Sequence, residues 1–88
     1  MSYSITFEPT AQEELDKLSA DIIERIINKL SEAKDFPEHF IEKLKEMPEF
    51  KIRVGDYRVI LIFDKRNKLL RIQAVSHRKN IYKKYKTD

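Results

Sequence analysis

The chain contains no cysteine, which excludes both a disulfide framework and a thiolate site. Its two histidines are too few for a typical histidine-based metal cluster. The longest uninterrupted apolar run, Val59 to Phe63, is far shorter than the roughly 20 residues that cross a membrane. The start, MSYSITFEP, lacks the charged and apolar regions of a signal peptide. We therefore expect a cytoplasmic protein that uses no metal or cofactor and does not enter a membrane.

Familiar catalytic motifs are also absent. The sequence has no P-loop, no nucleotide-binding glycine fingerprint, no H-E-x-x-H motif and no plausible nucleophile triad. The acids of the second half are Asp56, Asp64 and Asp88, so a magnesium site would need acids from the first half. The catalytic option that these absences leave is a reaction at a phosphate without a metal ion. RNA supplies its own nucleophile, the 2′-hydroxyl, so a protein need only orient the phosphate, stabilise its developing charge and move protons.

Charge is divided unevenly along the chain. The 88 residues suit one domain, 1–88, with one modest core and a net charge of +3. Residues 1–50 carry 6 Lys/Arg and 12 Asp/Glu, a net charge of −6, whereas residues 51–88 carry 12 and 3, a net charge of +9. The split indicates that the second half faces a polyanion. A merely solvated basic surface is the alternative interpretation.

The first half has the pattern of a scaffold. Residues 2–8 alternate as a strand, and TAQE at 10–13 predicts a capping box that opens a helix through Leu15 and Leu18. From Asp21 a second helix is predicted by apolar residues at helical spacing, namely Ile22, Ile23, Ile26, Ile27, Leu30 and Ala33. The two helices should form a hairpin that covers a sheet. Residues 38–47, between two prolines, predict a short amphipathic turn of helix whose length the sequence leaves open.

The stretch KIRVGDYR, residues 51–58, predicts a β-hairpin around the only glycine in the chain. A two-residue turn at 55–56 gives one entirely apolar face, with the pairs Val54–Tyr57, Ile52–Val59 and Phe50–Leu61. On the other face Arg53 lies opposite Arg58. Like charges in that position destabilise a strand pair by about 0.2 to 1 kcal/mol. Folding alone would not select such a pair.

The hairpin continues into a strand over 57–64, a turn at 65–68 and a last strand over 69–76. Their pairing should place Leu61 opposite Ile72 and Val59 opposite Ala74 on the core face. The second face is then expected to hold Lys51, Arg53, Arg58, Arg71 and Gln73, with Ile60 and Ile62 among them. The isoleucines need a cover, which the C-terminal tail, a partner segment or both would provide. The sequence thus predicts an α+β fold: an N-terminal strand, a helical hairpin, a three-stranded antiparallel meander and a basic tail.

Two segments carry a family resemblance. FKIRVGDYRVILIFD at 50–64 and IQAVSHRKNIY at 72–82 resemble the paired signature of RelE/ParE superfamily toxins, small partners in toxin–antitoxin operons, with the RelE branch the nearer. The resemblance covers nearly the whole chain and implies an architecture similar to microbial ribonucleases. It also implies an endoribonuclease that cuts mRNA on the ribosome without metal, leaving a 2′,3′-cyclic phosphate. An acidic RelB-like antitoxin in a hetero-oligomer is the implied partner.

The resemblance implies that the functional residues of the RelE branch correspond in this chain to Lys51, Arg53, Arg58, Arg78 and Tyr82. Lys51 would clamp phosphate or act as a general base, and Arg78 would stabilise the transition state or help the leaving oxygen. Tyr82 would stack on an RNA base and orient it. Arg58 lies in a segment shared with gyrase-poisoning ParE toxins, so a structural role is the alternative.

Two departures from the pattern leave proton transfer open. Arg53 stands where a well-studied pattern has lysine, and an arginine cannot act as a base near neutral pH. His77 is a further candidate for the base, although a lone histidine at a strand end is also common in a structural role. Tyr85 is the alternative to Tyr82 for stacking. A ParE-like gyrase poison and a non-catalytic nucleic-acid-binding module are the rival functions.

Overall fold

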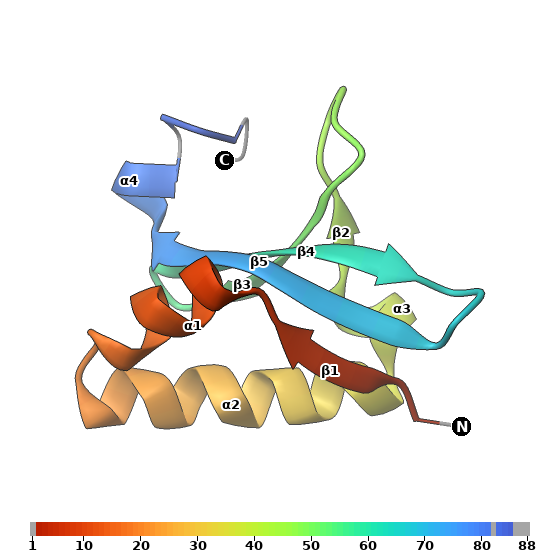
Figure 1. Ribbon diagram of the computed structural model, residues 1–88, viewed down its shortest axis with the longest axis horizontal. Coiled ribbons are helices and arrows are strands. Elements are labelled where there is room, and N and C mark those ends of the chain that lie inside the picture. The colour runs from red at the N-terminus through yellow and green to blue at the C-terminus, as the bar shows by residue number, and fades with distance from the viewer. Residues whose placement is uncertain (1, 82, 86–88) are drawn as a thin grey trace.

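The computed structural model describes residues 2–81 and 83–85 and has the predicted α+β fold (Figure 1). Its elements in chain order are β1 (Ser4–Phe7), α1 (Pro9–Asp16), α2 (Ala20–Asp35), α3 (Pro37–Phe40), β2 (Glu42–Lys43), β3 (Phe50–Val54), β4 (Tyr57–Asp64), β5 (Leu69–His77) and α4 (Arg78–Ile81). Among these residues, none of the helices has the length and apolar composition needed to cross a membrane.

The strands form one five-stranded sheet in the order β1-β5-β4-β3-β2. The antiparallel meander of β3, β4 and β5 confirms the prediction, and β1 joins it as a parallel neighbour of β5. The short strand β2 pairs with β3 at the opposite edge. The turn of helix expected within 38–47 is α3, which ends at Phe40, and the chain then continues into β2. A segment this short gains little from helix formation, so pairing with the sheet edge prevails.

The β3–β4 hairpin has the predicted register, with Val54 opposite Tyr57 and Arg53 opposite Arg58. Gly55 opens its turn with a φ of 58°, a backbone conformation that glycine adopts without steric cost. The apolar side of the hairpin faces the main core, where Ile52, Val59 and Leu61 are fully buried.

A β-bulge overturns one predicted pair between β4 and β5. Leu61 lies opposite Ile72 as expected, but Ile60 pairs with Ala74 and Val59 with Val75. Gln73 is therefore an extra residue on β5, and every later side chain of the strand changes face. The α1 residue Glu14 holds the strand after the bulge, because its Oε1 accepts a hydrogen bond of 3.0 Å from the Val75 N–H.

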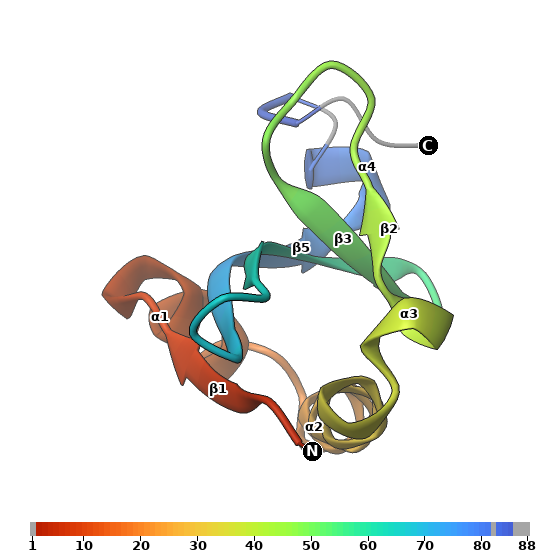
Figure 2. The same cartoon turned by 90° about the vertical axis from the view of Figure 1, so that its right-hand side faces the viewer.

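Helices α1 and α2 cover one face of the sheet, as predicted, while α4 lies on the other side (Figures 1 and 2). The capping box was wrong: α1 begins at Pro9, Glu8 is its N-cap residue without a side-chain hydrogen bond, and Thr10 lies inside the first turn. Proline is preorganised for that first position, so it fixes the start. The helix ends at Asp16, before Leu18.

One residue of the apolar stripe on α2 does not enter the core. Ile26 and Leu30 are buried as predicted, but Ile27 remains 43% exposed. Ile27 and Ile5 line an open groove beside β1. Because β1 is the edge strand of the sheet, the sheet does not extend far enough to cover this side of α2.

A second, smaller apolar cluster lies on the other face of the sheet. Ile60 is fully buried there beneath Leu44 from the β2–β3 connection and Ile81 and Tyr85 from the C-terminal segment. The expectation that the tail covers this isoleucine is therefore confirmed. Ile62 stays half-buried.

Candidate functional site

The sheet face opposite α1 and α2, which we term the basic face, carries Lys51 and Arg53 from β3 and Arg58 from β4. Alternation along each strand turns these three cations away from the main core. Lys51 and Arg58 are only 7% and 6% exposed, whereas the Arg53 side chain is 46% exposed. The structure thus brings together three of the predicted residues on adjacent strands.

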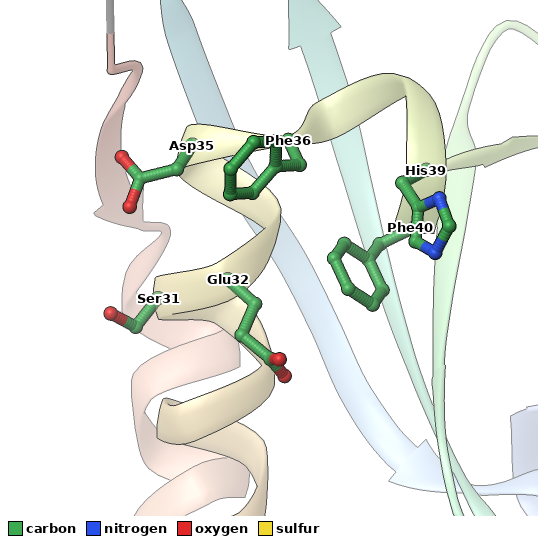
Figure 3. A pocket seen from close by; sticks show the side chains of 6 residues that line it. All are labelled: Ser31, Glu32, Asp35, Phe36, His39 and Phe40. Carbon is green, nitrogen blue, oxygen red and sulfur yellow. The ribbon is translucent and has the colours of Figure 1, made fainter.

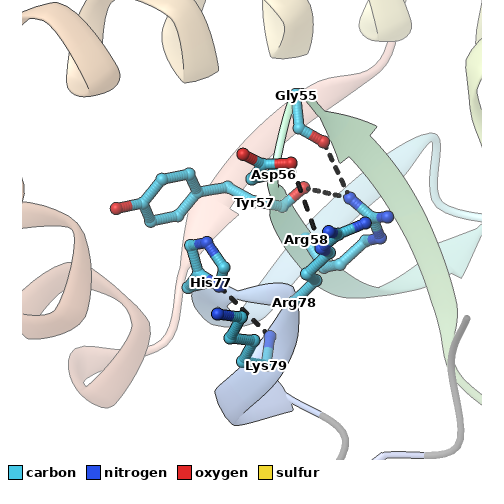
Figure 4. A network of polar contacts seen from close by, with 7 residues as sticks. All are labelled: Gly55, Asp56, Tyr57, Arg58, His77, Arg78 and Lys79. Atoms are coloured by element: carbon cyan, nitrogen blue, oxygen red, sulfur yellow. Dashed lines mark hydrogen bonds and ion pairs between the residues drawn. The ribbon is translucent and has the colours of Figure 1, made fainter.

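Arg58 is integrated into the hairpin turn (Figure 4). Its Nη1 atom donates hydrogen bonds to the carbonyl oxygen of Gly55 at 2.9 Å and to that of Tyr57 at 3.0 Å. Both contacts satisfy turn carbonyls with a buried, charged donor. Arg58 therefore has a structural role in addition to the charge it brings to the basic face.

Arg78 joins the same turn from the start of α4 (Figure 4). Its backbone N–H donates to the carbonyl oxygen of Asp56 at 2.8 Å, and its Nε lies 4.0 Å from Asp56 Oδ1. The side chain is 51% exposed. Two residues far apart in sequence, Arg58 and Arg78, are thus anchored to consecutive residues of one turn, so their positions are set together.

Glu42 is a member of the site that the sequence analysis missed. It lies directly across from Lys51 in the β2–β3 pair, and its Oε1 atom is 3.4 Å from Arg53 Nε. The carboxylate is a proton acceptor beside two cations of the basic face. A strand of two residues leaves no periodic signal, so only the β2–β3 pairing identifies it. The bulge likewise brings Ser76 opposite Arg58.

His77 lies on the other side of the sheet from Arg58. It pairs with Tyr57, whose ring packs against the main core, and the two rings contact edge to face with centroids 5.4 Å apart. Its Nδ1 accepts a hydrogen bond of 3.2 Å from the Lys79 N–H (Figure 4). The structure therefore does not bring this candidate base to the basic face.

Of the two tyrosines considered for stacking on a base, the structure describes only Tyr85. Tyr82 lies outside the described residues. Tyr85 is 9% exposed and packs in the second apolar cluster. Burial, followed by the nearby carboxylates of Glu49 and Glu14, raises the pKa of the Tyr85 hydroxyl. The ring of Tyr85 thus covers the sheet in this conformation and is not presented for stacking.

A separate hollow of about 420 Å³ lies at the end of α2 (Figure 3). It is lined by Ser31, Glu32, Asp35, Phe36, His39 and Phe40. His39 contacts the Phe40 ring edge to face, with centroids 4.9 Å apart. Acidic and aromatic residues dominate this hollow, so it has none of the phosphate-binding character of the basic face.

The comparisons with known proteins agree with this architecture. Residues 5–82 match the family model described as the ParE toxin of the type II toxin–antitoxin system parDE. None of the curated proteins compared with the chain matches it significantly.

Solved toxin–antitoxin structures share the fold. The RelBE2 complex from Mycobacterium tuberculosis has a chain that is 24% identical, with a TM-score of 0.81 over 88% of this chain and 99% of that one. The intact RelBE complex of E. coli gives 26% identity and a TM-score of 0.76 over 86% and 96% of the two chains. The RelB–RelE complex of Methanococcus jannaschii gives 26% and 0.69 over 88% and 94%.

These likenesses and the basic face define a small toxin of the RelE/ParE superfamily, with the RelE fold. The chain belongs to the ParE toxin family of type II toxin–antitoxin systems, whose model spans most of its length.

Proposed function

We propose that this toxin is a ribosome-dependent, metal-independent mRNA endoribonuclease that inhibits translation. The observation that carries the proposal is the opposition of Arg53 and Arg58 beside Lys51, with Arg78 anchored at the same turn. Such crowding of cations opposes folding, and a bound phosphate relieves it. Lysine and arginine offer a cation no ligand atoms at neutral pH, so these groups suit a phosphate and not a metal ion.

In the proposed reaction the RNA 2′-oxygen attacks the adjacent phosphorus while the bond from phosphorus to the 5′-oxygen breaks. The products are a 2′,3′-cyclic phosphate and a 5′-hydroxyl. Lys51 and Arg53 hold the phosphate, Arg58 adds charge from the turn, and Arg78 stabilises the charge that develops in the transition state. Tyr82 keeps its proposed role of stacking on a base.

The 2′-hydroxyl must lose its proton to a group on the same face. Arg53 cannot accept a proton near neutral pH, and His77 lies on the other side of the sheet. We assign the acceptor role to the carboxylate of Glu42, which lies 3.4 Å from Arg53 Nε and opposite Lys51. The proton that the leaving 5′-oxygen requires comes from water, because the arginines at the Asp56 turn keep their protons near neutral pH.

An antitoxin is the proposed partner, as in the RelB–RelE complexes that share the fold. The +9 charge of residues 51–88 and the half-buried Ile62 favour an acidic, partly apolar segment that folds across the basic face. Co-purification with the product of the adjacent gene tests this. A tight partner that is basic, or that docks wholly on residues 1–50, would contradict it.

A ParE-like gyrase poison is the second candidate, because the matching family model is that of ParE toxins. The discriminating experiment is in vitro translation with mapping of the mRNA ends, alongside a gyrase supercoiling assay. We expect cuts within ribosome-bound mRNA and unchanged supercoiling. A message with a 2′-deoxy sugar at the cut site should bind and stay intact, since the nucleophile is missing. Intact mRNA with poisoned gyrase would establish the rival function, and cleavage of the deoxy message would disprove the mechanism.

A further inference from the structure

A polar cleft of about 350 Å³ lies between α2 and the β3–β4 hairpin. Arg25, Asn28, Lys29 and Glu32 line it from the helix, and Arg53 and Gly55 line it from the hairpin. Three cations from two separate elements thus converge on one hollow. Arg53 also belongs to the basic face, so the cleft and that face share a wall.

Arg25 is the cation of this cleft that packs directly on the hairpin turn. Its guanidinium packs so closely on the hairpin turn that a Cβ atom at Gly55 would lie 2.6 Å from Arg25 Nη2. Within residues 2–81 and 83–85, Arg25 makes no ion pair. The glycine therefore admits an arginine that points at the turn and leaves its charge available to a ligand.

The other two cations of the cleft have acidic neighbours that an anion can replace. Lys29 Nζ lies 3.7 Å from Glu32 Oε1, and Arg53 Nε lies 3.4 Å from Glu42 Oε1. Both pairs lie at the surface with a third or more of each side chain exposed, and surface ion pairs contribute only about 0 to 1 kcal/mol to stability. A phosphate with more than one acceptor oxygen can therefore compete for these side chains.

The distribution of charge along the chain also supports an anion site in this cleft. Residues 1–50 have a net charge of −6 and contain six Lys/Arg residues. Two of these six, Arg25 and Lys29, line the cleft beside the hairpin of the basic half. Most other charges of α2 and its surroundings are acidic. The cleft extends the positive surface from Arg53 toward α2, in the direction that a polyanionic strand leaving the basic face would follow.

We propose that this cleft binds a backbone phosphate of the RNA strand, next to the phosphate held on the basic face. The RNA identity of the ligand rests on the proposed function, whereas the anion site rests on the cleft itself. Arg25 is its principal ligand and Lys29 and Arg53 flank it. The cleft is a binding subsite and takes no part in bond breaking.

The test uses the whole toxin without ribosomes and a single-stranded RNA hexamer with 2′-O-methyl sugars, which lacks the free 2′-hydroxyl nucleophile and cannot be cleaved. NMR follows the Gly55 amide and the Arg25 Nε–H, and affinity is measured across a salt series. We expect both signals to shift saturably with the oligomer. In Arg25→Gln the magnitude of the slope of log K against log salt should fall by about 0.7, the value for one phosphate contact with a single strand.

Two matched variants keep the outcome interpretable. Lys34→Gln removes a cation from the same helix outside the cleft and should retain the wild-type slope. Arg25→Lys keeps the charge and should also retain it, which covers the case in which Arg25→Gln folds poorly. Equal slopes for wild type and Arg25→Gln would overturn the proposal. Shifts with inorganic phosphate but not with the oligomer would also overturn it, because the cleft would then hold a free anion and not a strand. Neither result depends on cleavage.

Discussion

Arg53 and Arg58 lie directly opposite each other in the β3–β4 hairpin, but they differ in burial and in the groups they contact. Arg58 is 6% exposed and donates to the carbonyl oxygens of Gly55 and Tyr57. Arg53 has a side chain 46% exposed and lies 3.4 Å from Glu42. One arginine is part of the turn and the other is held at the surface. Substitutions should therefore separate stability from activity.

For Arg53→Ala we expect an unchanged or slightly higher melting temperature together with weaker RNA cleavage. The change removes a charge that repels Arg58, while the exposed pair with Glu42 is worth no more than about 1 kcal/mol. Thermal denaturation and a cleavage assay on the same preparation check this. Lys65→Ala, which removes an exposed cation paired with Glu38, is the control and should change neither. A clear fall in melting temperature would contradict the expectation.

For Arg58→Ala we expect a loss of stability of about 1 to 3 kcal/mol, because partly buried carbonyls of the turn lose a charged donor. Urea denaturation measures the loss. Arg58→Lys should recover only part of it, since one ammonium cannot reproduce the planar geometry of the guanidinium. If Arg58→Ala were as stable as the wild type, the hydrogen bonds to the turn would contribute nothing measurable.

For Lys51→Met and Arg78→Ala we expect the chemical step to slow by roughly 10²-fold or more, the usual scale for a lost transition-state donor. Methionine preserves the apolar stem of the buried Lys51, and Arg78 is exposed, so both variants should fold. Single-turnover cleavage of ribosome-bound mRNA is the measurement. Lys79→Ala removes the neighbouring exposed cation and serves as the control. Full activity in a variant that combines Lys51→Met with Arg78→Ala would rule out the roles assigned to Lys51 and Arg78.

For Gly55→Ala we expect a loss of about 1 to 2 kcal/mol, the cost of placing a Cβ atom in the left-handed region at a φ of 58°. Displacing the Arg25 guanidinium should add little, because it is the flexible end of a side chain. Gly55→Asn should lose less, since asparagine tolerates this conformation better. Chemical denaturation compares the two variants. Equal losses for alanine and asparagine would show that backbone strain is not the cause.

Tyr85 should make stability sensitive to alkaline pH. Its pKa is raised above the usual 10.0, first by burial and then by Glu49 and Glu14. The unfolded chain therefore loses this proton at a lower pH than the folded one, so the contribution is complete below about pH 10 and is lost as pH rises through the raised pKa. The free energy of unfolding should fall more steeply above pH 10 in the wild type than in Tyr85→Phe. Parallel curves would refute this.

Local features of the sequence were sufficient to predict the hairpin and the bounds of β4. The period of two in residues 50–54 and 57–64 and the single glycine between them determine a register that no distant contact needs to supply. That register also placed Lys51, Arg53 and Arg58 on one face. The charge division between the halves was likewise visible in the sequence alone.

Only the tertiary structure decided which other residues join that face. The strand β2 is two residues long and exists because β3 offers it a free edge, so Glu42 could not be found beforehand. The bulge at Gln73 brings Ser76 to the basic face. The burial of Tyr85 depends on Ile60 and Leu44, which lie in other parts of the chain. Turn chemistry and side-chain alternation act between near neighbours and can be read from sequence, whereas edge pairing, bulges and burial depend on segments that meet only after the chain has folded.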